Sequence, residues 1–119
     1  MPSPEAHRKQ ARHNQEVASQ LEAVALDWAI TAYFYAAAHL VRAYLAEHGY
    51  SFRTHGDVDK HLREVVNNKL LSPAAYQAYV NLYRNGLRAR YDCEPPEELK
   101  AVLETTKACL EVLTAELPL

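Results

Sequence analysis

Apolar residues recur along most of the chain with the spacing of an α-helix, and polar residues separate them into five segments. The segments are joined by short connections, which favours an antiparallel, up-and-down bundle of about five helices. We therefore predict an all-α fold. The helices are expected over residues 5–25, over residues 27–47, from 57 to about 70, from 73 to about 91, and from 97 to near the last residue.

The stretch from Asp27 to Glu47 is apolar on nearly every side and contains no Gly or Pro. At about 100° per residue it carries two stripes on opposite faces. The first stripe is wholly apolar: Ile30, Phe34, Ala37, Val41 and Leu45. The second stripe consists of Trp28, Ala32, Tyr35, His39 and Arg42, and each of its bulky members has a polar tip. A helix of this kind needs cover on both sides, so we expect it to lie at the centre of a bundle that also dimerises. The second stripe is where we expect function.

Local signals set the expected helix ends. Asp27 and Asp57 are predicted to cap the second and third helices, because a short acidic side chain can accept hydrogen bonds from free backbone N–H groups. Ser72 followed by Pro73 is typical of the start of a helix. Gly49 is placed to end the central helix.

Composition and charge limit the classes of function. The 119 residues fit one domain, 1–119, with a Pro/Ser tail at 1–4 that we expect to be flexible. A net charge of −2 gives no overall electrostatic reason to bind nucleic acid, and the basic run at 7–13 is typical of a solvated helix face. Cys93 and Cys109 lack metal spacing and are read as structural. Without a membrane-length apolar run or a signal-peptide core, we expect a cytoplasmic protein that needs no cofactor.

The fourth segment, SPAAYQAYVNLYRNGLRARYD, concentrates arginine and tyrosine. Arg84, Arg88 and Tyr91 fall on one helix face. Arg90 falls beside the inward-facing tyrosines, so we expect it to be partly buried and paired. Guanidinium groups bind phosphate with two hydrogen bonds and phenol rings stack on bases, a combination that suits a nucleotide. The alternative is that Arg84 and Arg88 are solvated and that Arg90 forms a structural ion pair.

Histidine offers two further kinds of chemistry. His39 lies on the polar-tipped stripe, where it is either a satisfied core residue or a general acid/base. His55 and His61 flank Asp57 and Asp59, and these side chains could bind a divalent metal if they converged on one point. The Gly and the helix start within this segment should spread them apart, so we expect no metal site.

The segment DWAITAYFYAAAHLVRAYLAEHG, the following His55 and the segment LYRNGLRARYD together resemble the HEPN superfamily (higher eukaryotes and prokaryotes nucleotide-binding domain). The resemblance covers residues 5–92. It implies a helical bundle that often forms homodimers. Many members of the superfamily are metal-independent ribonucleases that act as toxins, antiphage effectors or RNA-processing modules. Others are non-catalytic partners of nucleotidyltransferase-like proteins.

Ribonuclease members carry an Arg followed four to six residues later by a His, often written R-N-x-L-x-H-x-Y. Arg84, Asn85, Leu87 and Tyr91 match this form, but Ala89 stands at the histidine position. The motif is therefore degenerate. Two other pairs satisfy the spacing, Arg42 with His48 and Arg8 with His13. Neither lies in the segment 72–91, which corresponds to the helix that usually carries the motif in the family.

Taken together, these features predict a HEPN-like domain that binds RNA or a nucleotide, linked to toxin–antitoxin or defence systems. One alternative is a metal-independent ribonuclease in which His39 or His55 replaces the missing motif histidine as general base and acts with Arg84. The other is a dimeric, non-catalytic module for a nucleotidyltransferase-like antitoxin. The predicted binding residues are Arg84, Arg88, Arg90, Tyr91, Asn85 and Tyr35, with His39 and His55 lining the same cleft.

Overall fold

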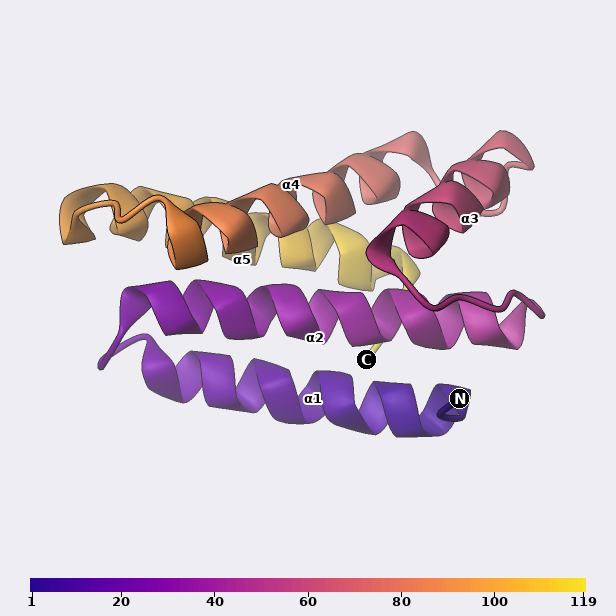
Figure 1. Ribbon diagram of the computed structural model, residues 1–119, viewed down its shortest axis with the longest axis horizontal. Coiled ribbons are helices and arrows are strands. Elements are labelled where there is room, and N and C mark those ends of the chain that lie inside the picture. Colours follow the sequence, from indigo (N-terminus) through magenta and orange to yellow (C-terminus); the bar gives the residue numbers. More distant parts are fainter.

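The computed structural model describes all 119 residues and contains five helices and no strand (Figure 1). This confirms the predicted all-α bundle and its helix count. The helices are α1 (Pro4–Leu21), α2 (Leu26–Glu47), α3 (His55–Asn67), α4 (Pro73–Tyr91) and α5 (Pro96–Glu116).

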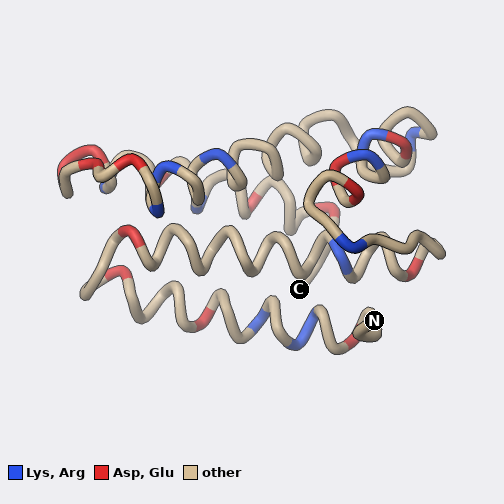
Figure 2. Tube along the Cα trace, in the orientation of Figure 1, with Lys and Arg blue, Asp and Glu red and all other residues tan.

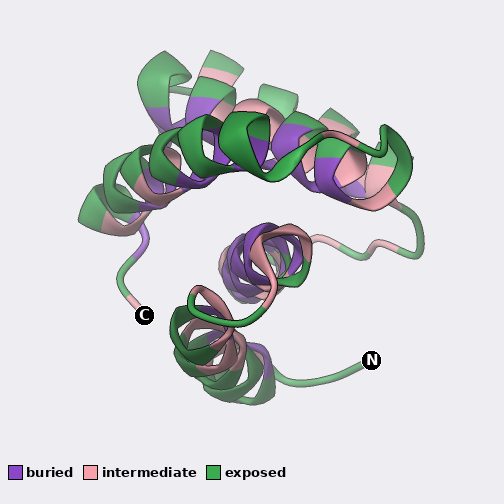
Figure 3. Cartoon of the chain, turned by 90° about the vertical axis from the view of Figure 1, so that its left-hand side faces the viewer, coloured by how far each residue is buried: buried purple, intermediate pink, exposed green.

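α2 lies at the centre, as its two-sided apolar pattern predicted. Seen nearly end-on, α1 lies on one side of α2, and α3, α4 and α5 form a layer on the other side (Figure 3). α1 packs against α2 and against no other helix, whereas α4 and α5 pack against α2 and against each other. The molecule measures 40 × 25 × 25 Å.

The predicted core stripes are buried. All five members of the apolar stripe of α2 are at most 5% exposed. In the last segment the helical spacing also predicts one core stripe, and all of its members are buried: Leu99, Val102, Leu103, Thr106, Leu110, Leu113 and Leu117. On α1, Ala11 and Ala18 are fully buried, and such small side chains let the axes of α1 and α2 approach closely.

Two predicted helix ends are confirmed. The Ser72 hydroxyl accepts a hydrogen bond from the Ala75 N–H (3.0 Å), which caps α4. Gly49 adopts the left-handed conformation (φ 82°) just after α2, where residues other than glycine are strained.

Both acidic cap predictions are wrong, and α1 ends at Leu21 rather than at Ala25. α2 starts after Ala25 without a side-chain cap, and Asp27 lies inside its first turn. For α3 the cap is Thr54, whose hydroxyl accepts from the Asp57 N–H (3.1 Å), while the Asp57 carboxylate accepts from the Thr54 N–H (3.2 Å). Asp57 is therefore the third residue of α3 rather than its cap, and the helix starts about one turn earlier than predicted.

Side chains fasten α1 near both of its ends. Just beyond the helix, Glu22 accepts hydrogen bonds from the Tyr33 hydroxyl of α2 and from the Lys107 ammonium of α5. Near the other end, Arg8 forms an ion pair with Glu47. Between Asp27 and Arg42, α2 carries no Lys, Arg, Asp or Glu, as the uncoloured stretch in Figure 2 shows. None of the helices combines the length and the apolar character needed to span a membrane.

Candidate functional site

The polar-tipped stripe of α2 lies between α1 and α4. His39 contacts His7 of α1, and Tyr35 lies beneath Arg90 of α4. Exposure differs along the stripe: Trp28 is 56% and Tyr35 45% exposed, whereas His39 and Arg42 are half-buried. The stripe therefore divides into an open part and a covered part.

The open part is an apolar hollow of about 500 Å³, which we call the aromatic groove. Leu21 and Asn14 form its α1 side, and the α2 side comes from the stripe and its neighbour Thr31. Its lining residues are Asn14, Leu21, Trp28, Thr31, Ala32 and Tyr35. Two large aromatic rings are thus held on a rigid helix and left open to solvent.

Arg90 lies at the edge of the aromatic groove. Its guanidinium carbon lies 5.5 Å from the ring centroids of Tyr35 and Tyr91 and 5.7 Å from that of Phe34. No carboxylate pairs with it, and its Nη1 is buried without a hydrogen-bond partner. The predicted partial burial is confirmed. The predicted ion pair is wrong, because aromatic faces take the place of an acid.

Gly86 makes room for this arrangement. A Cβ at this position would lie 3.3 Å from the Arg90 Nη1 and 3.2 Å from the Phe34 side chain. Both distances are tighter than ordinary van der Waals contact. The glycine of the RNGL segment therefore allows the guanidinium to approach the Phe34 ring.

The covered part of the stripe is a second polar group, which we call the histidine cluster. It consists of His7, His39, Arg42 and Phe52, which are linked by contacts, and of His55, on which the charge of Arg42 acts. The Nδ1 atoms of His7 and His39 lie 3.0 Å apart, so one ring donates a hydrogen bond and the other must be neutral to accept it. Phe52, from the loop after α2, places its ring 6.1 Å from the His7 ring, with the Arg42 guanidinium carbon 5.9 Å from the Phe52 centroid.

Burial and Arg42 together favour neutral histidines in this cluster. Burial is the main cause of the lowered pKa of His7, and the charge of Arg42 adds to it. Burial also lowers the pKa of His39, followed by the charges of His7 and Arg42. For His55, burial again lowers the pKa most, Asp59 opposes the shift, and Arg42 lowers it further. Neutral imidazoles can accept protons, as a general base must.

Two tyrosines of α4 extend the cluster. The His55 ring stacks on Tyr83, with centroids 3.8 Å apart and an interplanar angle of 8°. Tyr79 lies 6.1 Å from the same imidazole, and its hydroxyl is buried without a hydrogen-bond partner. Burial raises the pKa of Tyr79 to about 12, so the phenol stays protonated.

Comparison with known protein families matches the HEPN domain over residues 4–117. The chain belongs to the HEPN family. No curated protein matches it. The match extends past residue 92, where the resemblance in the sequence ended, and takes in α5. Within this HEPN domain, three of the predicted binding residues lie near one another: Tyr35 lines the aromatic groove, and the Arg90 guanidinium lies close to the rings of both Tyr35 and Tyr91.

The remaining predicted binding residues of the HEPN domain lie elsewhere on α4. Arg84 is exposed and makes no ion pair. Arg88 is held by Glu94, with its Nη2 2.6 Å from the carboxylate. Asn85 is buried and donates to the Thr106 hydroxyl (3.1 Å). Asn85 and Arg88 line a separate hollow of about 240 Å³ between α4 and α5. They serve the α4–α5 contact, so the proposed binding set omits both.

The side chains weighed as metal ligands each have a separate partner. His55 stacks on Tyr83, Asp57 accepts from the Arg53 and Thr54 N–H groups, and the His61 Nε2 lies 2.9 Å from the Ser51 carbonyl oxygen. No group of three potential ligands forms.

Sequence reasoning left out His7, Phe52 and Tyr79, and it placed Arg42 on the polar-tipped stripe without giving it a role. Arg42 had a usable signal, since it follows His39 on the same stripe. His7 had none and was assigned to a solvated face; that prediction is wrong for His7, which is only 5% exposed. The other Arg–His spacings do not build a site: His48 packs on Tyr44, and Arg8 pairs with Glu47.

Proposed function

We propose that this HEPN domain binds RNA or a nucleotide along the polar-tipped stripe of α2. In this proposal Trp28, Tyr35 and Tyr91 stack on bases, and Arg90 binds phosphate beside them. Arg84, exposed and without an ion pair on the same helix as Arg90, contributes a second cation. The observation that carries the proposal is that Arg90 has no carboxylate to balance its charge.

Arg90 is a partly buried cation without a counter-charge. Taking a guanidinium out of water costs free energy unless its donors and its charge find partners. The three rings satisfy part of the charge, but they leave Nη1 without a hydrogen bond. A phosphate that binds the accessible part of the guanidinium would supply the missing negative charge. Exposed rings directly beside it fit the base of the same nucleotide.

A binding measurement with a matched control tests this function. The change is Arg90→Gln, and the probe is a fluorescently labelled single-stranded RNA followed by anisotropy. Loss of one charge-assisted contact of about 1.4 kcal/mol should weaken binding about tenfold. Lys100→Gln removes an exposed cation that makes no ion pair on α5 and should leave the affinity unchanged. Equal affinities for wild type and Arg90→Gln, with unchanged helical circular dichroism, would contradict the proposal.

The histidine cluster supports a second function, metal-independent cleavage of RNA. Here His39, paired with His7, would take the proton from a ribose 2′-hydroxyl, and Arg42 would stabilise the added negative charge on the attacked phosphate. The 2′-oxygen forms a bond to phosphorus while the bond to the 5′-oxygen breaks, giving a cyclic phosphate and a 5′-hydroxyl that takes up a proton. His55, stacked on Tyr83, is the alternative base. This function would not use the motif histidine, which Ala89 replaces.

Cleavage is tested with mixed structured and unstructured RNA in EDTA. The wild type is compared with His39→Ala, His55→Ala and Arg84→Ala, each confirmed to be folded. EDTA-resistant cleavage that one of the histidine variants abolishes would establish a ribonuclease with a non-standard base. If no cleavage occurs while labelled RNA still binds, the domain is a binding module.

The aromatic groove also favours a third candidate, a protein partner. Its apolar lining and exposed Trp28 form the kind of surface that a second copy of the chain or a nucleotidyltransferase-like antitoxin would cover. Light scattering measures the molar mass of the purified protein and shows whether it is a homodimer. Trp28→Glu should dissociate a dimer formed through this groove, and an unchanged mass would exclude the groove as the interface.

A further inference from the structure

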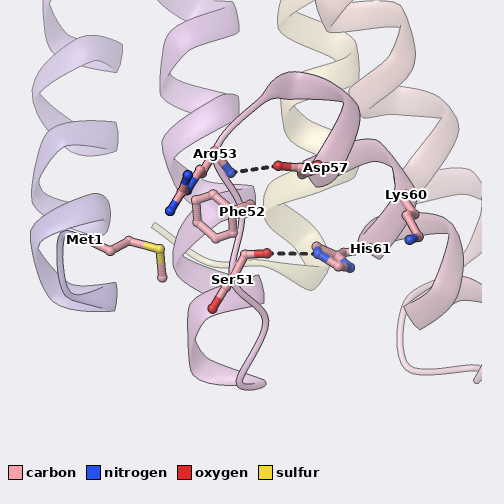
Figure 4. A pocket seen from close by; sticks show the side chains of 7 residues that line it. All are labelled: Met1, Ser51, Phe52, Arg53, Asp57, Lys60 and His61. Carbon is pink, nitrogen blue, oxygen red and sulfur yellow. Dashed lines mark hydrogen bonds between the residues drawn. The ribbon is translucent and has the colours of Figure 1, made fainter.

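A separate hollow of about 770 Å³ lies between the loop after α2 and the first turns of α3. We call it the loop pocket. Figure 4 shows Arg53 and Lys60 on opposite sides of it, with Asp57 and His61 between them. Its lining is mainly polar and consists of Met1, Ser51, Phe52, Arg53, Asp57, Lys60 and His61.

Three contacts fix the shape of the loop pocket. Phe52 is turned inward, where it lies between His7 and Arg42. Asp57 holds the backbone N–H groups of Arg53 (2.9 Å) and Thr54 (3.2 Å). His61 contacts the Ser51 carbonyl oxygen across the pocket. A short loop held at three points presents its side chains in a reproducible geometry, as a binding surface requires.

The charges that face the loop pocket are unbalanced. Arg53 and Lys60 make no ion pair. The one carboxylate in the lining, that of Asp57, is already engaged with backbone N–H groups, and these hydrogen bonds lower its pKa. In the first turn of α3, the Thr54 hydroxyl accepts a hydrogen bond from the Asp57 N–H. What remains available is a pair of free cations.

The volume indicates what the two cations can hold. A hollow of this size matches a drug- or nucleotide-sized group and is far larger than one phosphate ion. With Arg53 and Lys60 on opposite sides, consecutive phosphates of one chain can engage both cations. Phe52 connects the pocket to Arg42 and hence to the end of the stripe on α2.

We propose that the loop pocket binds the phosphate backbone of a single-stranded RNA that continues from the aromatic groove, so that the ligand is an oligonucleotide rather than a mononucleotide. This inference rests on the proposed function. Along the axis of α2, Trp28 and Arg42 are about 21 Å apart at about 1.5 Å per residue. At about 3.4 Å per stacked nucleotide, roughly six nucleotides cover this distance, and a few more reach Arg53 and Lys60.

The test compares single-stranded oligouridylates of about three and about ten nucleotides, lengths that reach the groove alone or the groove and the pocket. Affinities are measured by anisotropy for the wild type, for Arg53→Gln/Lys60→Gln and for Arg90→Gln. The control is Lys69→Gln/Lys100→Gln, which removes the same charge from two exposed lysines that make no ion pair. The four substituted cations of the two double variants form no ion pair, so the fold should be unaffected.

We expect the longer RNA to bind more tightly to the wild type and to the control. Arg53→Gln/Lys60→Gln should lose this advantage while binding of the short RNA stays the same. Removing two phosphate contacts in Arg53→Gln/Lys60→Gln should make the slope of log affinity against log salt shallower by about 1.4. Between about 50 and 200 mM salt, the loss of affinity for the longer RNA should then be roughly sevenfold smaller than in the wild type.

Two results would overturn the inference and leave the proposed function intact. One is equal affinity for short and long RNA in the wild type. The other is a full length advantage in Arg53→Gln/Lys60→Gln. In either case Arg90→Gln still weakens both RNAs. If neither RNA binds the wild type, the proposed function and this inference both fail.

Discussion

The two halves of the polar-tipped stripe follow one helix face, yet they end in opposite environments. Trp28 and Tyr35 stay open to solvent, whereas His39 and Arg42 are covered by His7 and Phe52. The helical period alone decides which residues share the face. What covers them is decided by a side chain of α1 and one of the loop after α2.

Each half also has an arginine that no carboxylate pairs with and that lies over at least one aromatic ring. Arg90 lies among three rings at the aromatic groove, and its Nη1 lacks an acceptor. Arg42 lies over one ring, donates to the Ala38 carbonyl oxygen (3.2 Å) and lowers the pKa values of three histidines. The first arrangement is suited to binding an anion. The second is suited to keeping bases neutral.

The largest expected difference between the halves is in stability. Phe52→Ala removes a half-buried ring that packs on His7 and Arg42, and it should lower the free energy of unfolding by about 2 kcal/mol. Tyr35→Ala alters an exposed ring and should change it by less than about 0.5 kcal/mol. Urea unfolding followed by circular dichroism measures both. Equal losses for the two variants would show that the halves are not covered differently.

The next difference is in affinity for a short RNA. Trp28→Ala removes a stacking surface and should cost about 1–2 kcal/mol of binding free energy. His39→Asn keeps a hydrogen-bonding group near the position of Nδ1 and should leave binding nearly unchanged, because the cluster is covered. Anisotropy titrations compare the two variants. A larger loss for His39→Asn would place the binding surface at the histidine cluster instead.

The smallest difference is in the response to pH. The lowered pKa values mean that the unfolded chain binds protons at His7 and His39 more readily than the folded chain. Their contribution to stability is therefore present above the unfolded pKa of about 6.5 and declines as pH falls through it. We expect a smaller loss between about pH 7 and 5 in His7→Asn/His39→Asn. Trp28→Ala should keep the wild-type slope, and a flattened slope there would contradict the assignment to the histidines.

Periodicity predicted the parts of the fold that depend on one helix at a time. The buried stripes of α2 and α5 are of this kind, and so is the cap at Ser72. Predictions that required a tertiary partner were less accurate. Arg90 was expected to meet an acid and instead meets rings from α2, since nothing in α4 alone reveals what lies opposite. His7 was read as solvated because it belongs to the basic run at 7–13.

α1 packs on α2 as its only neighbouring helix, apart from the contact of Glu22 with Lys107 of α5, and this has a consequence for local opening of the fold. A helix that packs on a single neighbour can detach without breaking the contacts among α2, α4 and α5. Its backbone amides should therefore exchange hydrogen with solvent through a partial unfolding that costs less than global unfolding. The amides of α2, covered from both sides, should exchange only when the whole domain unfolds. The strength of the α1 attachment would then set how often Ala11 and Ala18, and the face of α2 beneath them, meet solvent.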